Sequence, residues 1–270
     1  MAFSLGPRAT SAGYRLAAFD SIGSTNAEAL TQARGGEQGP IWFVTTEQTA
    51  GRGRRQRTWI APRGNLASSI LEVIDISPAV AATLGFAAGL ALETALREVS
   101  LEARIRSPGA ENMTFQLKWP NDVLAGRQKL AGILLEAEAV AHDRLAIIVG
   151  IGTNVIAAPE GTPYPAASLR DLGIDIGAED LFRALAEAWT EFRGIWDKGR
   201  GFGEIRRLWL DRAAGLGQPV SIQSGASAIA GLFDTIDESG CMIIATSDGK
   251  RVPVSAGDVY FGAAASMGAT

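Results

Sequence analysis

The sequence predicts an α+β fold, in which a mixed, mostly antiparallel sheet with helices on one side is followed by a small C-terminal β-barrel. Probable hairpins alternate with helical segments along most of the chain, which disfavours a doubly wound parallel sheet. Beyond Gly215-Leu216-Gly217, short β-rich pieces alternate with Ser-Gly and Asp-Gly turns. The content of 47% hydrophobic and 20% charged residues is typical of a folded chain. We expect a loose leader over 1–14, a main domain over 15–215 and the barrel over 216–270.

Each expected element follows from a local pattern. Thr25 and Glu28 form a capping box at the start of a helix. Apolar runs bounded by turn residues predict strands, and apolar positions three and four apart predict helices. The expected helices span 25–34, 79–99, 179–196 and 202–214. The expected strands of the main domain span 41–46, 66–74, 115–119, 129–138 and 145–151, and those of the barrel span 219–223, 228–236, 241–246, 250–254 and 259–261.

The segments between these elements are polar or rich in glycine. Residues 104–114 are expected to form a loop or insertion, and His142 is expected to lie in a turn. Gly150 and Gly152 are expected to end their strand in a polar turn that carries Asn154. This segment lacks the third glycine of a dinucleotide-binding turn, so a Rossmann site is not predicted.

Charge and cysteine content exclude several classes of function. The net charge of -4 and the pI near 5.2 argue against general binding to nucleic acid or to anionic membranes. The charge-free run 76–92 is rich in alanine and glycine, so we expect a core helix rather than a membrane span. Cys241 is the only cysteine, and neither an internal disulfide nor a Cys/His zinc site is expected. The N-terminus lacks the pattern of a secretion signal, which favours a cytoplasmic location.

A loop rich in glycine and arginine lies between two of the predicted strands. It contains four arginines between Ala50 and Trp59, and Gly51 and Gly53 let its backbone approach a ligand closely. Guanidinium groups offer several fixed donors to carboxylate or phosphate oxygens. The loop therefore predicts an anion site that is ordered by its ligand. Taken alone, the run also fits a solvated surface loop or an RNA-binding Gly/Arg segment, although such segments usually repeat.

Two further segments carry residues suited to phosphate chemistry. Lys118 stands at a strand end just before the turn Pro120-Asn121-Asp122, so a cation, an amide and a carboxylate lie close together. Lysine suits phosphate oxygens, and aspartate can hold Mg²⁺ or accept a proton. Lys129 begins an apolar strand in which Gly132 leaves room for a ligand against the sheet. An ordinary strand exit and an ordinary core strand are the alternative interpretations.

In combination, five motifs resemble those of the biotin protein ligases, and they occur in the order typical of that family. They are Ser24-Thr25-Asn26, Thr46-Glu47-Gln48-Thr49-Ala50-Gly51-Arg52-Gly53-Arg54, Lys118-Trp119-Pro120-Asn121-Asp122, Lys129-Leu130-Ala131-Gly132-Ile133-Leu134 and Gly150-Ile151-Gly152-Thr153-Asn154. The resemblance covers residues 15–262. It is closest to the short form of the family, because the stretch before Ser24 is too short for an N-terminal helix-turn-helix domain.

The resemblance implies a class II synthetase-like catalytic domain followed by a small C-terminal SH3-like β-barrel. It also implies an ATP-dependent biotin–[biotin carboxyl carrier protein] ligase. Such an enzyme makes biotinyl-5′-AMP, releases pyrophosphate and transfers biotin to a lysine of the biotin carboxyl carrier domain of a carboxylase. Mg²⁺ would accompany ATP without a permanent protein site. The enzyme would be a monomer or a homodimer that binds neither nucleic acid nor a membrane.

The resemblance also implies roles for individual residues. Catalytic roles fall to Lys129, Arg52, Lys118 and Asp122, and Asp122 is a candidate to receive the proton of the acceptor lysine. Biotin would be bound by Ser24, Thr25, Asn26, Gln48, Arg52, Gly53, Arg54, Lys129 and Gly132. ATP would be bound by Arg54, Arg55, Arg57, Trp59, Lys118, Asn121, Asp122 and Asn154.

The charges suit this reaction. A carboxylate must attack the α-phosphate of ATP, and the loop arginines with Lys118 and Lys129 reduce the repulsion between these two anions. A closing loop would then shield the mixed anhydride from water. Gln56 departs from the family pattern, in which glycine is usual, and 104–114 is longer than the usual connection.

Two alternatives stay open at the level of sequence. A lipoate ligase shares the fold by resemblance, but it usually has a different arginine-glycine motif and lacks the Lys-Trp-Pro-Asn-Asp element. A non-catalytic protein that binds biotin or nucleic acid is the alternative from another class. Release of pyrophosphate from ATP in response to biotin separates the enzyme from this second alternative.

Overall fold

The computed structural model describes residues 2–106, 113–140, 144–161, 164–224 and 227–261. The strands of the main domain are β1 (Arg15–Phe19), β2 (Ile41–Thr45), β3 (Leu66–Ile74), β4 (Phe115–Lys118), β5 (Asp122–Ala125), β6 (Gln128–Val140) and β7 (Arg144–Thr153). Those that follow are β8 (Pro219–Ser224), β9 (Ser227–Ile236), β10 (Met242–Ala245), β11 (Arg251–Val254) and β12 (Asp258–Phe261). The helices are α1 (Pro7–Ser11), α2 (Thr25–Arg34), α3 (Pro78–Ala82), α4 (Leu84–Arg106), α5 (Ala178–Trp196) and α6 (Phe202–Leu210), with the 3-10 turns η1 (Arg54–Gln56) and η2 (Asp197–Gly199).

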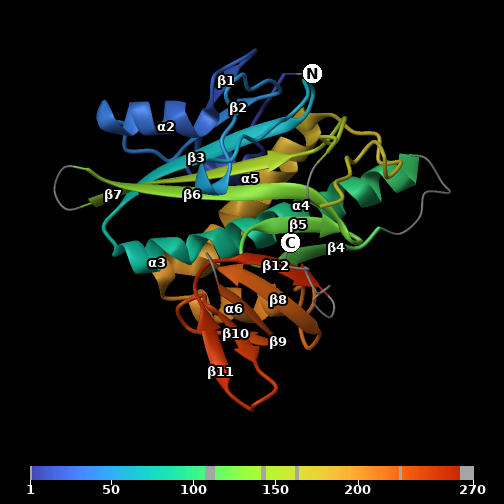
Figure 1. The fold of residues 1–270 in the computed structure, drawn as a ribbon. Coiled ribbons are helices and arrows are strands. Elements are labelled where there is room, and N and C mark those ends of the chain that lie inside the picture. The colour runs from blue at the N-terminus through green and yellow to red at the C-terminus, as the bar shows by residue number, and fades with distance from the viewer. Residues whose placement is uncertain (1, 107–112, 141–143, 162–163, 225–226, 262–270) are drawn as a thin grey trace.

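Two sheets organise the chain (Figure 1). The first has seven strands in the order β1-β2-β3-β7-β6-β5-β4, where β1 and β2 run parallel and the other neighbours run antiparallel. The second has five antiparallel strands in the order β11-β10-β9-β8-β12. The predicted fold class, a mostly antiparallel α+β sheet followed by a β domain, is therefore confirmed.

The first sheet carries helices on both faces. Because side chains alternate along a strand, Trp42 and Ile70 point into the large core against α4 and α5, while Phe43 and Leu71 point to the opposite face. There they pack with Ala29 of α2. The long helices lie on one side as predicted, but the short α2 covers the other side (Figure 1). This correction matters for the site, because α2 begins at the cavity described below.

The long apolar helical stretch is a core element. The run Pro78–Arg106 is long and apolar enough to cross a membrane, and 72% of its most apolar window is buried inside the protein. Its neighbours are α5 and α6 on one flank and β4 to β6 on the other. The expectation of a core helix is confirmed. The helix also continues to Arg106, so the expected loop over 104–114 begins later than predicted, and its residues 107–112 lie outside the described residues.

Most predicted elements are present with small shifts of their ends, and three expectations need correction. The segment expected to be a loose leader carries α1, whose Ala9 is fully buried and whose backbone amides at Arg8 and Ala9 bond the carboxylate of Glu187. Neither β1 nor β5 was among the predicted strands, and Asp122, expected in a turn, is the first residue of β5. Strand β7 runs on to Thr153, because its ladder with β3 continues past the glycines. The turn expected at His142 lies outside the described residues.

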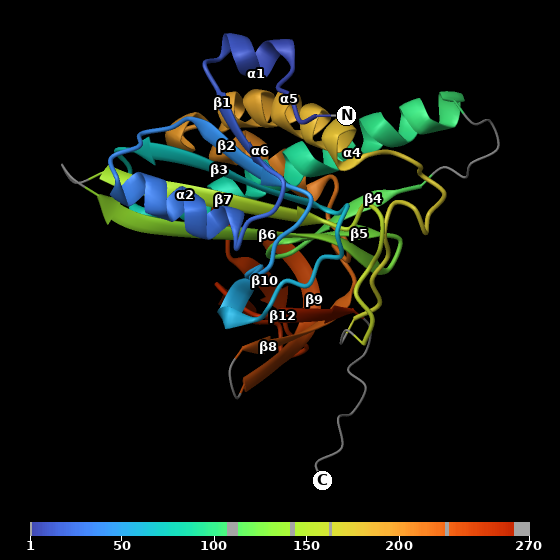
Figure 2. The same ribbon diagram turned by 90° about the horizontal axis from the view of Figure 1, so that it is seen from above.

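The second sheet packs under the first domain and reaches its cavity. Trp119 Nε1 donates to the carbonyl of Gly240, 3.1 Å away, across the two units. Strand β12 lies on the edge of the second sheet that faces the arginine loop, as Figure 2 shows for the light blue segment beside β12. Two residues of β12, Asp258 and Val259, thereby become part of the cavity wall.

Candidate active site

A cavity of about 280 Å³ opens above β3, β7 and β6, between the arginine loop and β12. Every residue predicted for the site lies on its wall, although these residues come from segments far apart in the sequence. They are Ser24, Thr25, Asn26, Gln48, Arg52, Gly53, Arg54, Arg55, Arg57, Trp59, Lys118, Asn121, Asp122, Lys129, Gly132 and Asn154. The wall also includes Tyr164 and Asp258, which the sequence did not indicate.

The floor of the cavity depends on glycines in adjacent strands. Gly132 of β6 lies directly opposite Gly152 of β7. A Cβ atom on Gly152 would lie 2.6 Å from the indole of Trp59, and one on Gly132 would lie 3.2 Å from the same ring. Only glycine at position 152 lets the Trp59 ring lie this close to the sheet. Gly152 therefore lies within the sheet and not in the turn that the sequence suggested, whereas Gly132 lies in a strand as predicted.

Neutral polar side chains gather at one end of the cavity, where α2 begins. Ser24 is the N-cap of α2 and accepts from the amide of Ala27, so the first turn presents Thr25 and Asn26 to the sheet. Their exposed fractions are 3% and 4%. A Cβ on Gly150 would lie 2.1 Å from Asn26 Oδ1, which explains why β7 has glycine there. We call Ser24, Thr25, Asn26, Gln48 and Ser69 the polar floor.

Hydrogen bonds join the members of the polar floor. The backbone amide of Thr25 donates to Gln48 Oε1 over 2.8 Å, and the Thr25 hydroxyl lies 3.1 Å from the same oxygen. The hydroxyl of Ser69, on β3, donates to Asn26 Oδ1 over 2.6 Å. Because Ser24, Thr25, Asn26 and Ser69 are buried, Gln48 is half-buried, and these contacts already join Thr25 to Gln48 and Asn26 to Ser69, the polar floor is preformed.

The arginine loop folds as a small hairpin over the opposite side of the cavity. Arg52 pairs with Thr58 in an antiparallel bridge, and the amide of Trp59 donates to the carbonyl of Gly51 over 3.0 Å. The turn between them is η1, in which Arg55 has a φ of 54°. This left-handed conformation is uncommon for a residue with a side chain.

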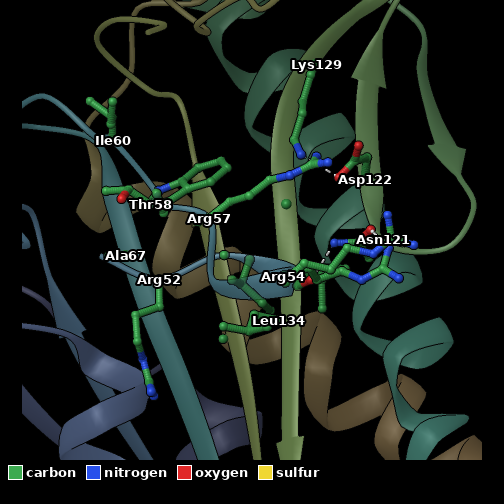
Figure 3. A pocket seen from close by; sticks show the side chains of 18 of the residues that line it. Arg52, Arg54, Arg57, Thr58, Ile60, Ala67, Asn121, Asp122, Lys129 and Leu134 are labelled. Atoms are coloured by element: carbon green, nitrogen blue, oxygen red, sulfur yellow. Dashed lines mark hydrogen bonds and ion pairs between the residues drawn. The ribbon is translucent and has the colours of Figure 1, made fainter. Parts of the chain in front are cut away.

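The four arginines of the loop point in different directions. Arg52 bonds Glu136 over 2.9 Å at the end nearest the polar floor, and Figure 3 shows it pointing away from Lys129. Arg54 points inward and donates to Asn121 Oδ1 over 2.9 Å. Burial lowers the pKa of Arg54, with a further contribution from the charge of Arg55. The inward position of Arg54 thus concentrates positive charge in a partly dry place.

The other two arginines reach the second sheet. Arg55 Nη1 and Arg57 Nη2 lie 3.1 Å and 2.9 Å from the same oxygen of Asp258, at the start of β12. The two arginine side chains are 41% and 61% exposed, and that of Asp258 is 21% exposed. These contacts fasten the loop to the C-terminal part of the chain, although such exposed pairs are individually weak.

Lys118, Lys129 and Asp122 lie near Arg54 on the cavity wall. We call the region of Arg54, Lys118 and Lys129 the cationic end. Lys129 Nζ lies 2.6 Å from Asp122 Oδ1 and 5.7 Å from the centroid of the Trp59 ring (Figure 3). Lys118 Nζ lies 4.2 Å from the centroid of the Tyr164 ring, and the residue is 7% exposed. Burial lowers the pKa of Lys118, which the nearby charge of Asp122 partly offsets. A buried ammonium group of this kind is stabilised by a bound anion.

The cavity is strongly positive although the chain is acidic. Six cationic side chains line it, namely Arg52, Arg54, Arg55, Arg57, Lys118 and Lys129, against the two carboxylates Asp122 and Asp258. Both carboxylates already hold cations. Within the described ranges, no group of three or more His, Cys, Asp or Glu side chains could hold a metal ion. The site is therefore built to receive an anion rather than a bare cation.

Two comparisons identify the class of protein that this fold and site define. The model of the biotin/lipoate A/B protein ligase family matches residues 19–154, and that of the biotin protein ligase C-terminal domain matches residues 215–262. The chain therefore belongs to the biotin/lipoate A/B protein ligase family.

Similar proteins place the chain among the biotin protein ligases within that family. It is 38% identical to the biotin–[acetyl-CoA-carboxylase] ligase of Paracoccus denitrificans over 88% of this chain and 97% of the relative. The ligase of the same name from Mycobacterium tuberculosis is 34% identical over 88% of this chain and 85% of its own. The solved structure of the Aquifex aeolicus biotin protein ligase with biotin and ATP superposes with a TM-score of 0.73 at 26% identity, covering 92% and 99% of the two chains.

Proposed function

We propose that this enzyme activates biotin with ATP to biotinyl-5′-AMP and then transfers the biotin to a lysine of a biotin carboxyl carrier domain. The observation that carries the proposal is one cavity with a neutral polar end and a cationic end. Buried neutral donors and acceptors suit the ureido ring of biotin, and clustered cations suit its carboxylate and the phosphates of ATP. The complex of the Aquifex aeolicus relative with biotin and ATP supports the same pair of substrates.

The proposed biotin site extends from the polar floor to Lys129. In the polar floor, Thr25, Asn26 and Gln48 offer both hydrogen-bond donors and acceptors, as a ureido group requires. Gly132, which was expected to leave room for a ligand, and Gly152 instead let the Trp59 ring lie against the sheet, and this ring would flank the rest of the molecule. The carboxylate of biotin would then lie beside Lys129, within reach of the cationic end.

The first proposed step joins this carboxylate to ATP. A carboxylate oxygen attacks the α-phosphorus, the bond from that phosphorus to the bridging oxygen breaks, and pyrophosphate leaves. Lys129, Lys118 and Arg54 surround this region, and positive charge held in place stabilises the negative charge of the transition state. Asn154 Oδ1 and Trp59 Nε1 are buried without a hydrogen-bond partner among the described residues, and both are on the wall that ATP would meet.

The second proposed step transfers biotin from the adenylate. The amine of the acceptor lysine attacks the carbonyl carbon of biotinyl-AMP, an amide bond forms, and AMP leaves with the electron pair of the broken C–O bond. The lysine proton needs an acceptor, and Asp122 is the carboxylate nearest to Lys129 on the wall. Closure of Arg52, Gly53 and Arg54 over the intermediate would exclude water until the carrier domain arrives.

Several further parts of this proposal concern partners and organisation. Mg²⁺ would come bound to ATP, because Asp122 and Asp258 are each already paired with cations. The catalytic domain would span 15–215 and the C-terminal domain 216–270. A cytoplasmic location fits substrates that are found there, and the enzyme would work as a monomer or a homodimer.

The decisive test is transfer of biotin to a carrier domain. Purified protein is mixed with ATP, Mg²⁺, biotin and the biotin carboxyl carrier domain of a carboxylase, and the carrier is weighed by mass spectrometry. We expect a gain of one biotin per carrier and, without the carrier, biotin-dependent exchange of pyrophosphate into ATP. Binding of biotin without pyrophosphate exchange would contradict the enzymatic proposal.

A parallel reaction tests the choice of acid. Lipoate replaces biotin in an otherwise identical mixture that also contains a lipoyl carrier domain. The polar floor predicts no lipoate transfer, because a dithiolane ring would leave its buried donors and acceptors unpaired. Lipoate transfer at a rate comparable to that of biotin would show that the neutral end does not select the ureido ring.

A further inference from the structure

Glu136 links the arginine loop to the polar floor, and no role in the reaction described so far uses it. Gly132, Leu134 and Glu136 lie on the same face of β6, because alternate residues of a strand point the same way. The first two line the cavity, whereas Glu136, two residues further along the strand, is not one of the lining residues. Its side chain is 31% exposed.

A single oxygen of Glu136 accepts hydrogen bonds from both regions. Asn26 Nδ2 donates to Glu136 Oε2 over 2.7 Å, and Arg52 Nη2 donates to the same oxygen over 2.9 Å. A change in the position of either donor therefore alters the environment of the other. Bonds to an ionised acceptor are stronger than neutral ones, which makes this shared oxygen an effective connection.

The connection continues through the polar floor. Asn26 Oδ1 accepts from Ser69, whose hydroxyl lies 2.7 Å from Thr25 Oγ1, and Thr25 in turn contacts Gln48. Cooperative polarisation strengthens such chains in a partly dry environment. An unbroken series of polar contacts thus runs from Arg52 of the loop through Asn26 and Thr25 to Gln48.

A simple surface ion pair is the alternative interpretation of Arg52 and Glu136. Exposed pairs of this kind contribute little to stability, and the Arg52 side chain is 41% exposed. Asn26 is different, because it is 4% exposed and keeps a second acceptor, the carbonyl of Leu134 at 3.3 Å. Loss of the Glu136 charge should therefore leave the Asn26 side chain in its position but weaken the contact through Glu136 that joins it to Arg52.

We propose that Glu136 is a positioning residue that couples closure of the arginine loop to recognition of the ureido end of biotin. This inference rests on the proposed function. When biotin fixes Asn26, the amide holds Glu136 Oε2 in place and thereby favours the closed position of Arg52. Coupling is reciprocal, so a closed loop also raises the affinity for biotin.

The test measures how strongly biotin protects the loop from trypsin, which cleaves after arginine. The rate of cleavage after Arg55 and Arg57 is followed by mass spectrometry, without biotin and at saturating biotin. In the wild type we expect biotin to slow this cleavage. In Glu136→Gln, which keeps the shape and removes the charge, we expect the protection factor to fall about 5-fold or more.

Two further variants give the control and the check on the partner. Glu138→Gln removes the next carboxylate on the same face of β6, which pairs with Arg34 outside the cavity, and it should keep the wild-type protection factor. Arg52→Met should lose protection as Glu136→Gln does, and the double variant Arg52→Met/Glu136→Gln should lose no more than either single one. Full protection in Glu136→Gln, or equal loss in Glu138→Gln, would overturn the inference.

Binding of biotin to the wild type, measured by calorimetry on the same samples, separates this inference from the proposed function. If the wild type binds no biotin, the proposed function itself is wrong. If the wild type binds biotin and exchanges pyrophosphate but Glu136→Gln retains full protection, only the role of Glu136 is wrong.

Discussion

The polar floor and the arginine loop face each other across one cavity and are held in place by different forces. In the polar floor, Thr25 and Asn26 are almost completely buried, and neutral hydrogen bonds to Gln48 and Ser69 fix them. In the loop, Arg55 and Arg57 are exposed and rely on ion pairs with Asp258. The end that would recognise biotin is thus part of the folded core. The end that would meet ATP depends on contacts that a charged ligand or salt can replace.

The largest expected effect concerns the cationic end. Lys129→Ala should reduce biotin-dependent pyrophosphate exchange about 100- to 1,000-fold, because a fixed charge that stabilises the transition state is lost. Biotin affinity should fall much less, since the polar floor is intact. Lys250→Ala, which removes an exposed lysine paired with Asp248, is the control and should react at the wild-type rate. Wild-type exchange by Lys129→Ala would remove this lysine from the site.

The next prediction compares the free energy of unfolding of a variant in the polar floor with that of a variant in the arginine loop. Asn26→Ala removes one hydrogen-bond partner from the buried Ser69 hydroxyl and one from Glu136, so the free energy of unfolding should fall by about 1 to 3 kcal/mol together with the affinity for biotin. Arg54→Ala should change the free energy of unfolding by less than about 0.5 kcal/mol, because the loss of its hydrogen bond to Asn121 is offset by relief of a partly buried charge beside Arg55. It should nevertheless weaken retention of the adenylate about 10-fold or more.

Urea unfolding and the rate of adenylate release are the two measurements for this pair of variants. The contrast between the regions requires that Asn26→Ala changes both quantities and that Arg54→Ala changes only the second. Equal losses of stability in the two variants would mean that the loop is as much a part of the core as the floor.

The smallest expected effect concerns the contact between the loop and the second sheet. Asp258→Asn removes the charge that Arg55 and Arg57 share, and adenylate should escape about 2- to 5-fold faster at low salt, as expected for exposed pairs. The difference should shrink at high salt, because screening already weakens the wild-type pairs. Asp248→Asn, in an exposed turn of the same sheet, is the matched control. A salt-independent effect would argue against an ionic contact.

Local patterns were sufficient to predict most of the elements that build the cavity, but not β5, which carries Asp122. The Thr25–Glu28 pattern placed the start of α2, although the N-cap is Ser24 and the predicted capping box is wrong. The apolar run over 66–74 predicted β3 with both ends correct. Strand β1 was missed because its burial alternates weakly at the edge of the sheet, so its short sequence has no clear apolar face. Helix α1 was missed because its stability comes from contacts with α5, far along the chain, and not from its own sequence.

The residues of the site also fall into two groups, those that local sequence motifs predict and those that only tertiary contacts bring to the site. Those in contiguous motifs, such as Lys129 with Gly132, were predictable because the motif carries them together. Asp258 was not, since it reaches the loop only when β12 pairs with β8, more than two hundred positions after Arg55. Glu136 belonged to a predicted strand, but its position beside Asn26 appears only once α2 packs across the sheet.

The placement of Trp59 over Gly132 and Gly152 gives the protein an intrinsic fluorescent probe of its cavity. The other five of its six tryptophans, Trp42, Trp119, Trp189, Trp196 and Trp209, are at most 3% exposed and lie in the hydrophobic core. Trp59 alone is half-buried, and its indole faces the cavity. Trp119 also lines the cavity but is 2% exposed, whereas the other four core rings do not line it, so the emission of those four should stay constant when the cavity fills. A change in the tryptophan emission spectrum should then report occupancy in real time, with neither a dye nor a label.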